Sequence, residues 1–182
     1  GVNFGLFSVP VCKSGYLVIG FEPVKSNYDS SIANLENNAC KNFKLLNLAL
    51  SNKTENTTIY IPECPDNASL NKDAAILNMA NKSYKEELIT CVKFDELNQE
   101  SETSINPKDV GLIKSDTQGN CYKVIEGMQE FLLQTENIYL IVEFEPHLFK
   151  MNYTYEQLHS LITGLGFRQI STIANDRVYY KN

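Results

Sequence analysis

Residues 16–23 read Tyr-Leu-Val-Ile-Gly-Phe-Glu-Pro, an apolar run that ends in a single acid. A continuous apolar run of this length is typical of a parallel β-strand that is buried on both faces. In a sheet of such strands, ligands bind at the carboxyl ends. Glu22 stands at that end, so the sequence predicts a ligand site there.

A short glycine motif, Gly1-Val-Asn-Phe-Gly5, precedes this strand and leads into a helical stretch at residues 6–12. Glycines let a backbone approach a ligand closely, and the start of a helix offers free N–H groups. Glu22 follows Gly1 by about 21 residues, a spacing at which a carboxylate can accept hydrogen bonds from both hydroxyls of a ribose. The motif and the acid together predict an adenosine site.

Strand and helix signals alternate along the rest of the chain. This alternation predicts an α/β fold, a mostly parallel sheet with helices on both faces, in a single domain of residues 1–182. The final two strands predict an antiparallel C-terminal hairpin, and the polar stretch 51–56 predicts an earlier hairpin-like turn. We expect strands at residues 43–50, 57–61, 88–94, 109–115, 138–143, 167–173 and 177–180, and helices at 27–39, 73–80, 95–102, 120–133 and 154–165.

A second acid, Asp116, follows the predicted strand 109–115. An acid at the end of a neighbouring strand would face the same crevice as Glu22 and could orient an acceptor hydroxyl or hold one end of a cofactor. Aspartate is also a strong helix N-cap, and the helix 120–133 begins just after it. We favour the functional interpretation and keep the helix cap as the alternative.

Composition excludes several classes of partner. The chain is 43% hydrophobic and carries a net charge of −6 without a cluster of Lys and Arg, so nucleic acid is not an expected partner. Its longest apolar runs, at residues 17–21 and 138–142, are far shorter than a membrane span. The five cysteines form no C-x-x-C pair, which favours separate buried thiols over a zinc site or a disulfide scaffold.

The sequence leaves two alternatives for the cellular compartment of the protein. We expect a cytoplasmic protein, but the sequons leave a glycosylated lumenal domain as the alternative. The chain does not start with Met and shows no signal-peptide pattern. The oligomeric state is not predicted. Five N-x-S/T sequons occur, at Asn52, Asn56, Asn67, Asn81 and Asn152.

Six short motifs, in order, resemble those of the FkbM-type methyltransferase family. The resemblance covers about residues 1–146 and implies a Rossmann-like methyltransferase fold with S-adenosylmethionine as the cofactor. It also implies a small-molecule or glycan acceptor that is methylated on a hydroxyl. The motifs are Gly1-x-Asn3-x-Gly5, Phe21-Glu-Pro23, Asn47-Leu-Ala-Leu-Ser51, Leu112-Ile-Lys-Ser-Asp-Thr-Gln-Gly119, Val124-Ile-Glu-Gly127 and Ile141-Val-Glu-Phe144.

The resemblance also implies roles for individual residues. Asp116 would lie closest to the transferring methyl group, and Glu143 and His147 would border the acceptor site. A hydroxyl acceptor must lose its proton, for which Asp116 or His147 is the candidate base. The other histidine, His159, falls within a predicted helix and is expected at the surface or core edge. The implied cofactor-binding residues are Gly1, Asn3 and Gly5 in the loop, Glu22 on the ribose, and Leu48 and Ala49 beside the adenine.

The chain departs from the family pattern at a few positions. The family tends to have Glu where Gln118 stands and another Glu near Cys121, which supports a catalytically inactive binding or assembly domain as the alternative function. The family's central first strand and its acid would lie upstream of residue 1, so we expect the first strand to be truncated and the isolated piece to bind cofactor poorly. A nicotinamide-dependent oxidoreductase would need G-x-G-x-x-G, and the third glycine is missing.

Overall fold

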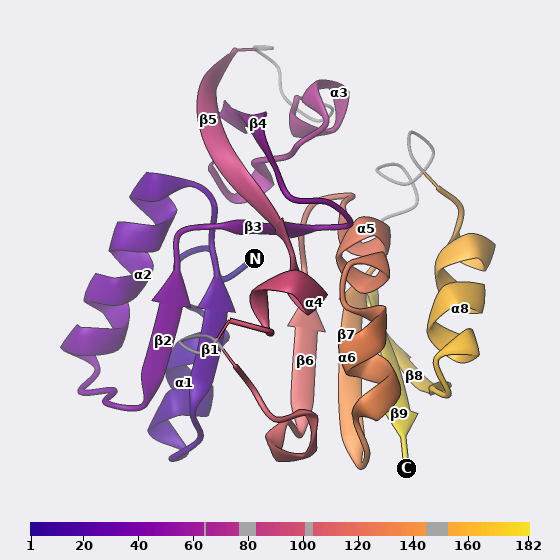
Figure 1. Cartoon of the computed structure of the whole chain (residues 1–182). Helices are drawn as coiled ribbons and strands as arrows, with labels where there is room; N and C mark the ends of the chain where they lie inside the picture. The colour runs from indigo at the N-terminus through magenta and orange to yellow at the C-terminus, as the bar shows by residue number, and fades with distance from the viewer. Residues whose placement is uncertain (64, 77–82, 101–103, 145–152) are drawn as a thin grey trace. The chain divides into compact units, whose positions relative to one another are not determined.

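The structure is a computed structural model that describes residues 1–63, 65–76, 83–100, 104–144 and 153–182 (Figure 1). The chain forms two compact units, and each is described by itself. The first unit consists of Gly1–Ala49 and Glu55–Cys91, and the second of Leu50–Thr54 and Val92–Asn182. No helix among the described residues is both long enough and apolar enough to span a membrane.

The first unit begins with two helices and a parallel strand pair. Its elements are α1 (Ser8–Lys13), β1 (Val18–Phe21), α2 (Lys25–Asn37) and β2 (Phe43–Leu46). The two strands run parallel, with Val18 beside Phe43, which confirms the strand and helix predicted here. The helix α2 starts at Lys25, two residues before the predicted start, and the carboxylates of Glu22 and Glu87 accept the N–H groups of Val24 and Lys25 there.

Most of the remaining first unit belongs to a three-stranded sheet in which β4 and β5 pair antiparallel. The strand β5 lies between β3 and β4, so the hairpin-like turn predicted at residues 51–56 is wrong, because both flanking strands pair with β5 and not with each other. An apolar cluster beneath this sheet includes Val24, Ile59 and Ile89. The elements are β3 (Ala49–Ser51), β4 (Glu55–Pro62), the 3-10 helix η1 (Pro65–Asn67), α3 (Lys72–Ala75) and β5 (Tyr84–Lys93).

The second unit carries a four-stranded sheet of order β6-β7-β9-β8. β6 and β7 are parallel, and β9 pairs antiparallel with both β7 and β8, which confirms the predicted C-terminal hairpin. The elements are α4 (Phe94–Leu97), η2 (Pro107–Asp109), β6 (Leu112–Ser115), α5 (Cys121–Glu126), α6 (Gln129–Gln134), β7 (Ile138–Glu143), α8 (Tyr155–Gly164), β8 (Arg168–Ile173) and β9 (Asp176–Lys181).

The fold is therefore mixed α/β, as predicted, but its strands are distributed differently from the expectation. Instead of one mostly parallel sheet, the described residues form three sheets, of two, three and four strands, with parallel and antiparallel pairs. The parallel pairs are β1-β2 and β6-β7. The carboxyl ends of these two pairs carry the acids that the sequence singles out.

The helix predicted at 120–133 is in fact two helices, α5 and α6, which follow one another end to end (Figure 1). The break falls at Gly127, whose backbone packs so closely on Ser51 that an added Cβ would lie 1.9 Å from the Ser51 carbonyl oxygen. The buried Asp95 then caps α6, because its carboxylate accepts the N–H groups of Glu130 (3.1 Å) and Phe131 (3.0 Å). Contacts between distant residues, and not local propensity, end the first helix.

We expect Gly127→Ala to destabilise the second unit. The added methyl must displace the Ser51 backbone, and overpacking of this kind costs about 1–3 kcal/mol, or a fall in Tm of roughly 2–10 °C. Gly111→Ala is the matched control, because nothing lies within 4 Å of its added Cβ. Thermal unfolding followed by circular dichroism checks the prediction, and equal Tm values for the two variants would contradict it.

Candidate functional site

Residues 1–5 form a tight loop beside the carboxyl end of β1. The Val2 N–H donates to the Phe21 carbonyl (3.2 Å), and the Gly5 N–H donates back to the Val2 carbonyl (3.0 Å). Asn3 and Gly5 both have left-handed backbones, with φ of 53° and 83°, a conformation that glycine adopts without strain. Gly20 in β1 makes room for the loop, because a Cβ there would lie 2.4 Å from Val2 Cγ2.

Glu22 links this loop to the start of α2. Its side chain is buried, with 4% of the residue exposed. One carboxylate oxygen accepts the Asn3 N–H at 2.8 Å, and the other accepts the Val24 N–H at 3.1 Å. Each oxygen of an ionised carboxylate has a second lone pair, so both can still accept a hydrogen bond from a ligand hydroxyl. The structure thus brings together Asn3 and Glu22, two of the predicted site residues.

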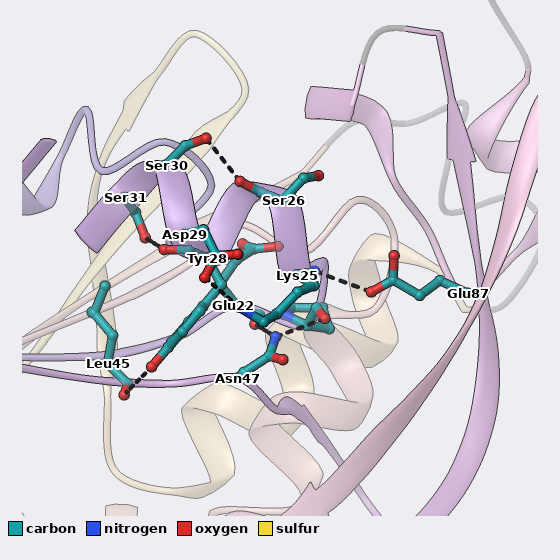
Figure 2. Close-up of polar contacts among 11 residues, drawn as sticks. Glu22, Lys25, Ser26, Tyr28, Asp29, Ser30, Ser31, Leu45, Asn47 and Glu87 are labelled. Atoms are coloured by element: carbon teal, nitrogen blue, oxygen red, sulfur yellow. Dashed lines mark hydrogen bonds and ion pairs between the residues drawn. The ribbon is translucent and has the colours of Figure 1, made fainter. Parts of the chain in front are cut away.

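Two side chains that sequence reasoning missed hold the turn after Glu22 (Figure 2). Asn47 Nδ2 donates to the carbonyls of Glu22 (2.8 Å) and Pro23 (2.9 Å), which ties the end of β2 to the end of β1. Glu87 Oε1 accepts the Lys25 N–H at 3.0 Å. Asn47 had a usable signal, because it is the first residue of one of the six motifs. Glu87 had none, since it comes from a distant strand.

Leu48 and Ala49, the residues expected beside adenine, lie just before β3 and at its first position, in the same unit as Glu22. Leu48 is half-buried. Ala49 is buried and belongs to the apolar cluster with Val24 and Ile89. Gly1 is exposed at the start of the loop. Their contacts with a cofactor remain predictions.

Asp116 and Glu143 lie together in the second unit, as expected for residues at the ends of neighbouring strands. The paired strands β6 and β7 align Ser115 with Val142, and each acid is the residue that follows. Glu143 lies close enough to Asp116 to influence its pKa, and Lys114 Nζ lies 2.6 Å from Asp116 Oδ2. His147, the other expected acceptor-site residue, lies outside the described residues.

Lys114 lowers the pKa of Asp116. Burial by itself raises the pKa of this carboxyl. The hydrogen bond and positive charge of Lys114 lower it, and the net result is a pKa below the ordinary value of 3.8. Asp116 is therefore ionised at neutral pH. The alternative interpretation of Asp116 as a helix cap is wrong, because α5 begins at Cys121 after Asn120, and the Tyr153 hydroxyl accepts the Tyr122 N–H of its first turn at 2.8 Å.

We expect Lys114→Met to raise the pKa of Asp116, because burial then acts without its opposing cation. A lowered carboxyl pKa stabilises the fold above the ordinary pKa, and this stabilisation is lost as the pH falls through the lowered value. The Tm of the variant should therefore lie a few degrees below wild type at pH 7, and the difference should shrink below about pH 4. Lys123→Met in α5 is the control, and a difference that persists unchanged to pH 2 contradicts the prediction.

The positions that depart from the family pattern lie close to these acids. Gln118 has a left-handed backbone (φ 44°), and its Nε2 lies 3.5 Å from Glu143 Oε2. Cys121 is fully buried and donates to the Ser115 carbonyl at 3.4 Å, and burial raises the pKa of its thiol. The cysteine thus packs against the end of β6. His159 is half-buried on α8 with Nδ1 3.1 Å from the Tyr179 hydroxyl, which confirms its expected place at the core edge.

Residues 1–169 match a family described as the methyltransferase FkbM domain. The chain belongs to this family. The fold of this FkbM domain is similar to the crystal structure of methyltransferase FkbM from Methylobacillus flagellatus KT, with a TM-score of 0.61 and 12% sequence identity. That match covers 99% of this chain and 41% of the other, so this FkbM domain spans about two-fifths of that chain's length. Curated proteins give no match.

Family membership confirms the resemblance read from the six sequence motifs. At 12% identity, the structural likeness shows the fold and not the reaction. Among the described residues, no three His, Cys, Asp or Glu side chains come together as a metal site. Two sets of residues stand at the ends of the parallel strands, Glu22 with its loop and Asp116 with its neighbours.

Proposed function

We propose that this FkbM domain binds S-adenosylmethionine and transfers its methyl group to a hydroxyl of a sugar or another small molecule. The observation that carries the proposal is the buried Glu22 carboxylate, which ends β1 and is hydrogen-bonded to Asn3 of the glycine loop. A fixed carboxylate at the end of a parallel strand is the group that accepts both hydroxyls of a ribose in nucleoside-binding sheets.

The residues of the first unit fit the adenosine part of this cofactor. Glu22 is already oriented by two backbone N–H groups, so little side-chain freedom is lost when a ribose binds. The loop from Gly1 to Gly5 has no bulky side chain at either end and is held by Asn34, whose Nδ2 donates to the Phe4 carbonyl at 2.8 Å. A loop fixed in this way suits close approach of a ligand to the backbone.

The residues of the second unit fit the binding and deprotonation of an acceptor hydroxyl. When bound, S-adenosylmethionine supplies an electrophilic methyl group on a sulfonium. The protein then has to align the acceptor hydroxyl, exclude water and receive the hydroxyl proton. Asp116, whose pKa Lys114 lowers, can accept a hydrogen bond from that hydroxyl and take its proton. Glu143 beside it can hold a second hydroxyl of a polyhydroxylated acceptor.

A domain that binds the cofactor without transferring the methyl group is the second candidate. Gln118 favours it, because an amide beside Glu143 replaces the acid that the family tends to have and cannot act as a base. Under this alternative, S-adenosylmethionine binds but is not consumed.

The test uses the full-length protein with S-adenosylmethionine labelled in its methyl group and a panel of sugars and small hydroxylated compounds. The proposal predicts acceptor-dependent formation of S-adenosylhomocysteine, together with a mass gain of one methyl group on the acceptor. Cofactor binding without turnover on any acceptor would favour the non-catalytic alternative. Absence of cofactor binding would exclude both.

A further inference from the structure

Two cysteines of the first unit share one apolar cluster. Cys12 lies on α1, and Cys40 follows α2 on the way into β2. Both pack with Leu35 and are buried, with 5% and 8% of their surfaces exposed. The other cysteines that the structure describes lie elsewhere, Cys91 in the cluster beneath β4 and β5, and Cys121 in the second unit.

Each thiol donates a hydrogen bond to a backbone carbonyl that lies close in the chain to the other cysteine. Cys12 Sγ donates to the carbonyl of Asn42, two residues past Cys40, at 3.6 Å. Cys40 Sγ donates to the carbonyl of Val9, one helical turn before Cys12, at 3.8 Å. The two thiols are also close enough for Cys12 to raise the pKa of Cys40. Both are free, buried thiols, as expected, but these two share one cluster.

We propose that Cys12 and Cys40 form a disulfide when the protein meets a small-molecule disulfide such as oxidised glutathione. The bond would clamp α1 to the segment between α2 and β2, and it would enclose β1, Glu22 and α2. It is a covalent modification of the unit that carries the glycine loop, and it does not depend on the proposed methyl transfer.

The chemistry is two successive thiol–disulfide exchanges. The thiolate of one cysteine attacks glutathione disulfide, which forms a mixed disulfide and releases one glutathione thiol. The thiolate of the other cysteine then attacks the protein sulfur of the mixed disulfide, which forms the Cys12–Cys40 bond and releases the second glutathione. The pair loses two protons and two electrons, and one glutathione disulfide is reduced to two thiols.

Burial sets the rate of this reaction. Burial raises the pKa of the Cys40 thiol, and the neighbouring Cys12 thiol raises it further. Little thiolate is present at neutral pH, so the disulfide should form slowly in the folded protein. As long as the pH is below that pKa, the rate should rise about tenfold for each unit by which the pH is increased. During folding, both thiols are exposed and the bond should form more readily.

The bond should stabilise the protein strongly. It closes a loop of about 28 residues, and a cross-link of this span removes enough unfolded-state entropy to raise the Tm of a chain this size on the order of 10 °C. A disulfide of this kind persists only in an oxidising compartment. Its presence in protein isolated from cells would favour the lumenal alternative that the sequons leave open, over the cytoplasm.

The test is peptide mapping of the full chain after refolding, and after prolonged native incubation, in glutathione buffers of increasing oxidised fraction. Trypsin cleaves after Lys13, Lys25 and Lys41, so the disulfide links peptide 1–13 to peptide 26–41. We expect this linked peptide in wild type and in Cys91→Ser, and its loss on reduction. We also expect a higher Tm for the oxidised form of these two proteins, and neither effect in Cys40→Ser or Cys12→Ala.

Two results would overturn the proposal. The first is the absence of the 1–13/26–41 linkage after refolding in oxidised glutathione, or the linkage of either cysteine to a different one. The second is a Cys12–Cys40 bond that leaves the Tm unchanged or lowers it. Comparison of oxidised and reduced wild type needs no mutation, so the test holds even if one of the serine or alanine variants fails to fold.

Discussion

Replacing Glu22 with glutamine is expected to weaken S-adenosylmethionine binding about 10- to 100-fold. The charged acceptor that we assign to the ribose hydroxyls becomes neutral, and hydrogen bonds to charged groups contribute about 1.5–3 kcal/mol each. One end of the new amide would also face the N–H of Asn3 or Val24, which now donate to the carboxylate. Isothermal titration gives the dissociation constants directly.

Glu87→Gln is the matched control for this variant. Glu87 also accepts a backbone N–H at the start of α2, from Lys25, but it does not contact the glycine loop in the described structure. We expect the dissociation constant of the Glu87→Gln variant for S-adenosylmethionine to stay within about threefold of wild type, a change of less than 1 kcal/mol in binding free energy. Equal weakening by both substitutions would show that Glu22 acts only through the stability of α2.

Replacing Asp116 with asparagine is expected to lower the rate of methyl transfer about 10²- to 10⁴-fold, the usual contribution of a general base. The substitution keeps the shape of the side chain but removes the charge that pairs with Lys114. Cofactor binding should change by less than about threefold, because in the proposed function Asp116 acts on the acceptor. Single-turnover rates and binding constants separate the two effects.

Asp109→Asn is the control for this second variant. Asp109 is an exposed acid near the opposite end of β6, in η2, so its loss should leave both transfer and binding near wild type. An Asp116→Asn protein that transfers methyl groups at the wild-type rate would remove Asp116 from the reaction. The role of base would then pass to another residue, with His147 the remaining sequence candidate.

Sequence patterns predicted elements best where strong local signals agree. The predicted strand 138–143 matches β7 at both ends, and the last two predicted strands correctly gave the C-terminal hairpin. Thr154 caps α8 through a capping box with Gln157. In each case the residues that decide the structure are neighbours in the chain.

Errors arose where distant residues decide the outcome. The break in the helix 120–133 depends on contacts of Gly127 with Ser51 and Asp95, and no local pattern shows them. Contacts that the sequence does not show also decide part of the candidate site. Glu22 and Asp116 were identified from motifs at strand ends, whereas Lys114, which lowers the pKa of Asp116, becomes recognisable only when the side chains are placed.

In the proposed function, the site around Glu22 binds the adenosine of S-adenosylmethionine and not that of a nicotinamide cofactor. Titration of the full-length protein with each ligand in turn distinguishes the two. We predict saturable one-to-one binding of S-adenosylmethionine, with a dissociation constant on the order of 1–100 μM, and no measurable binding of NAD. Tighter binding of NAD, or no binding of S-adenosylmethionine, would contradict the account.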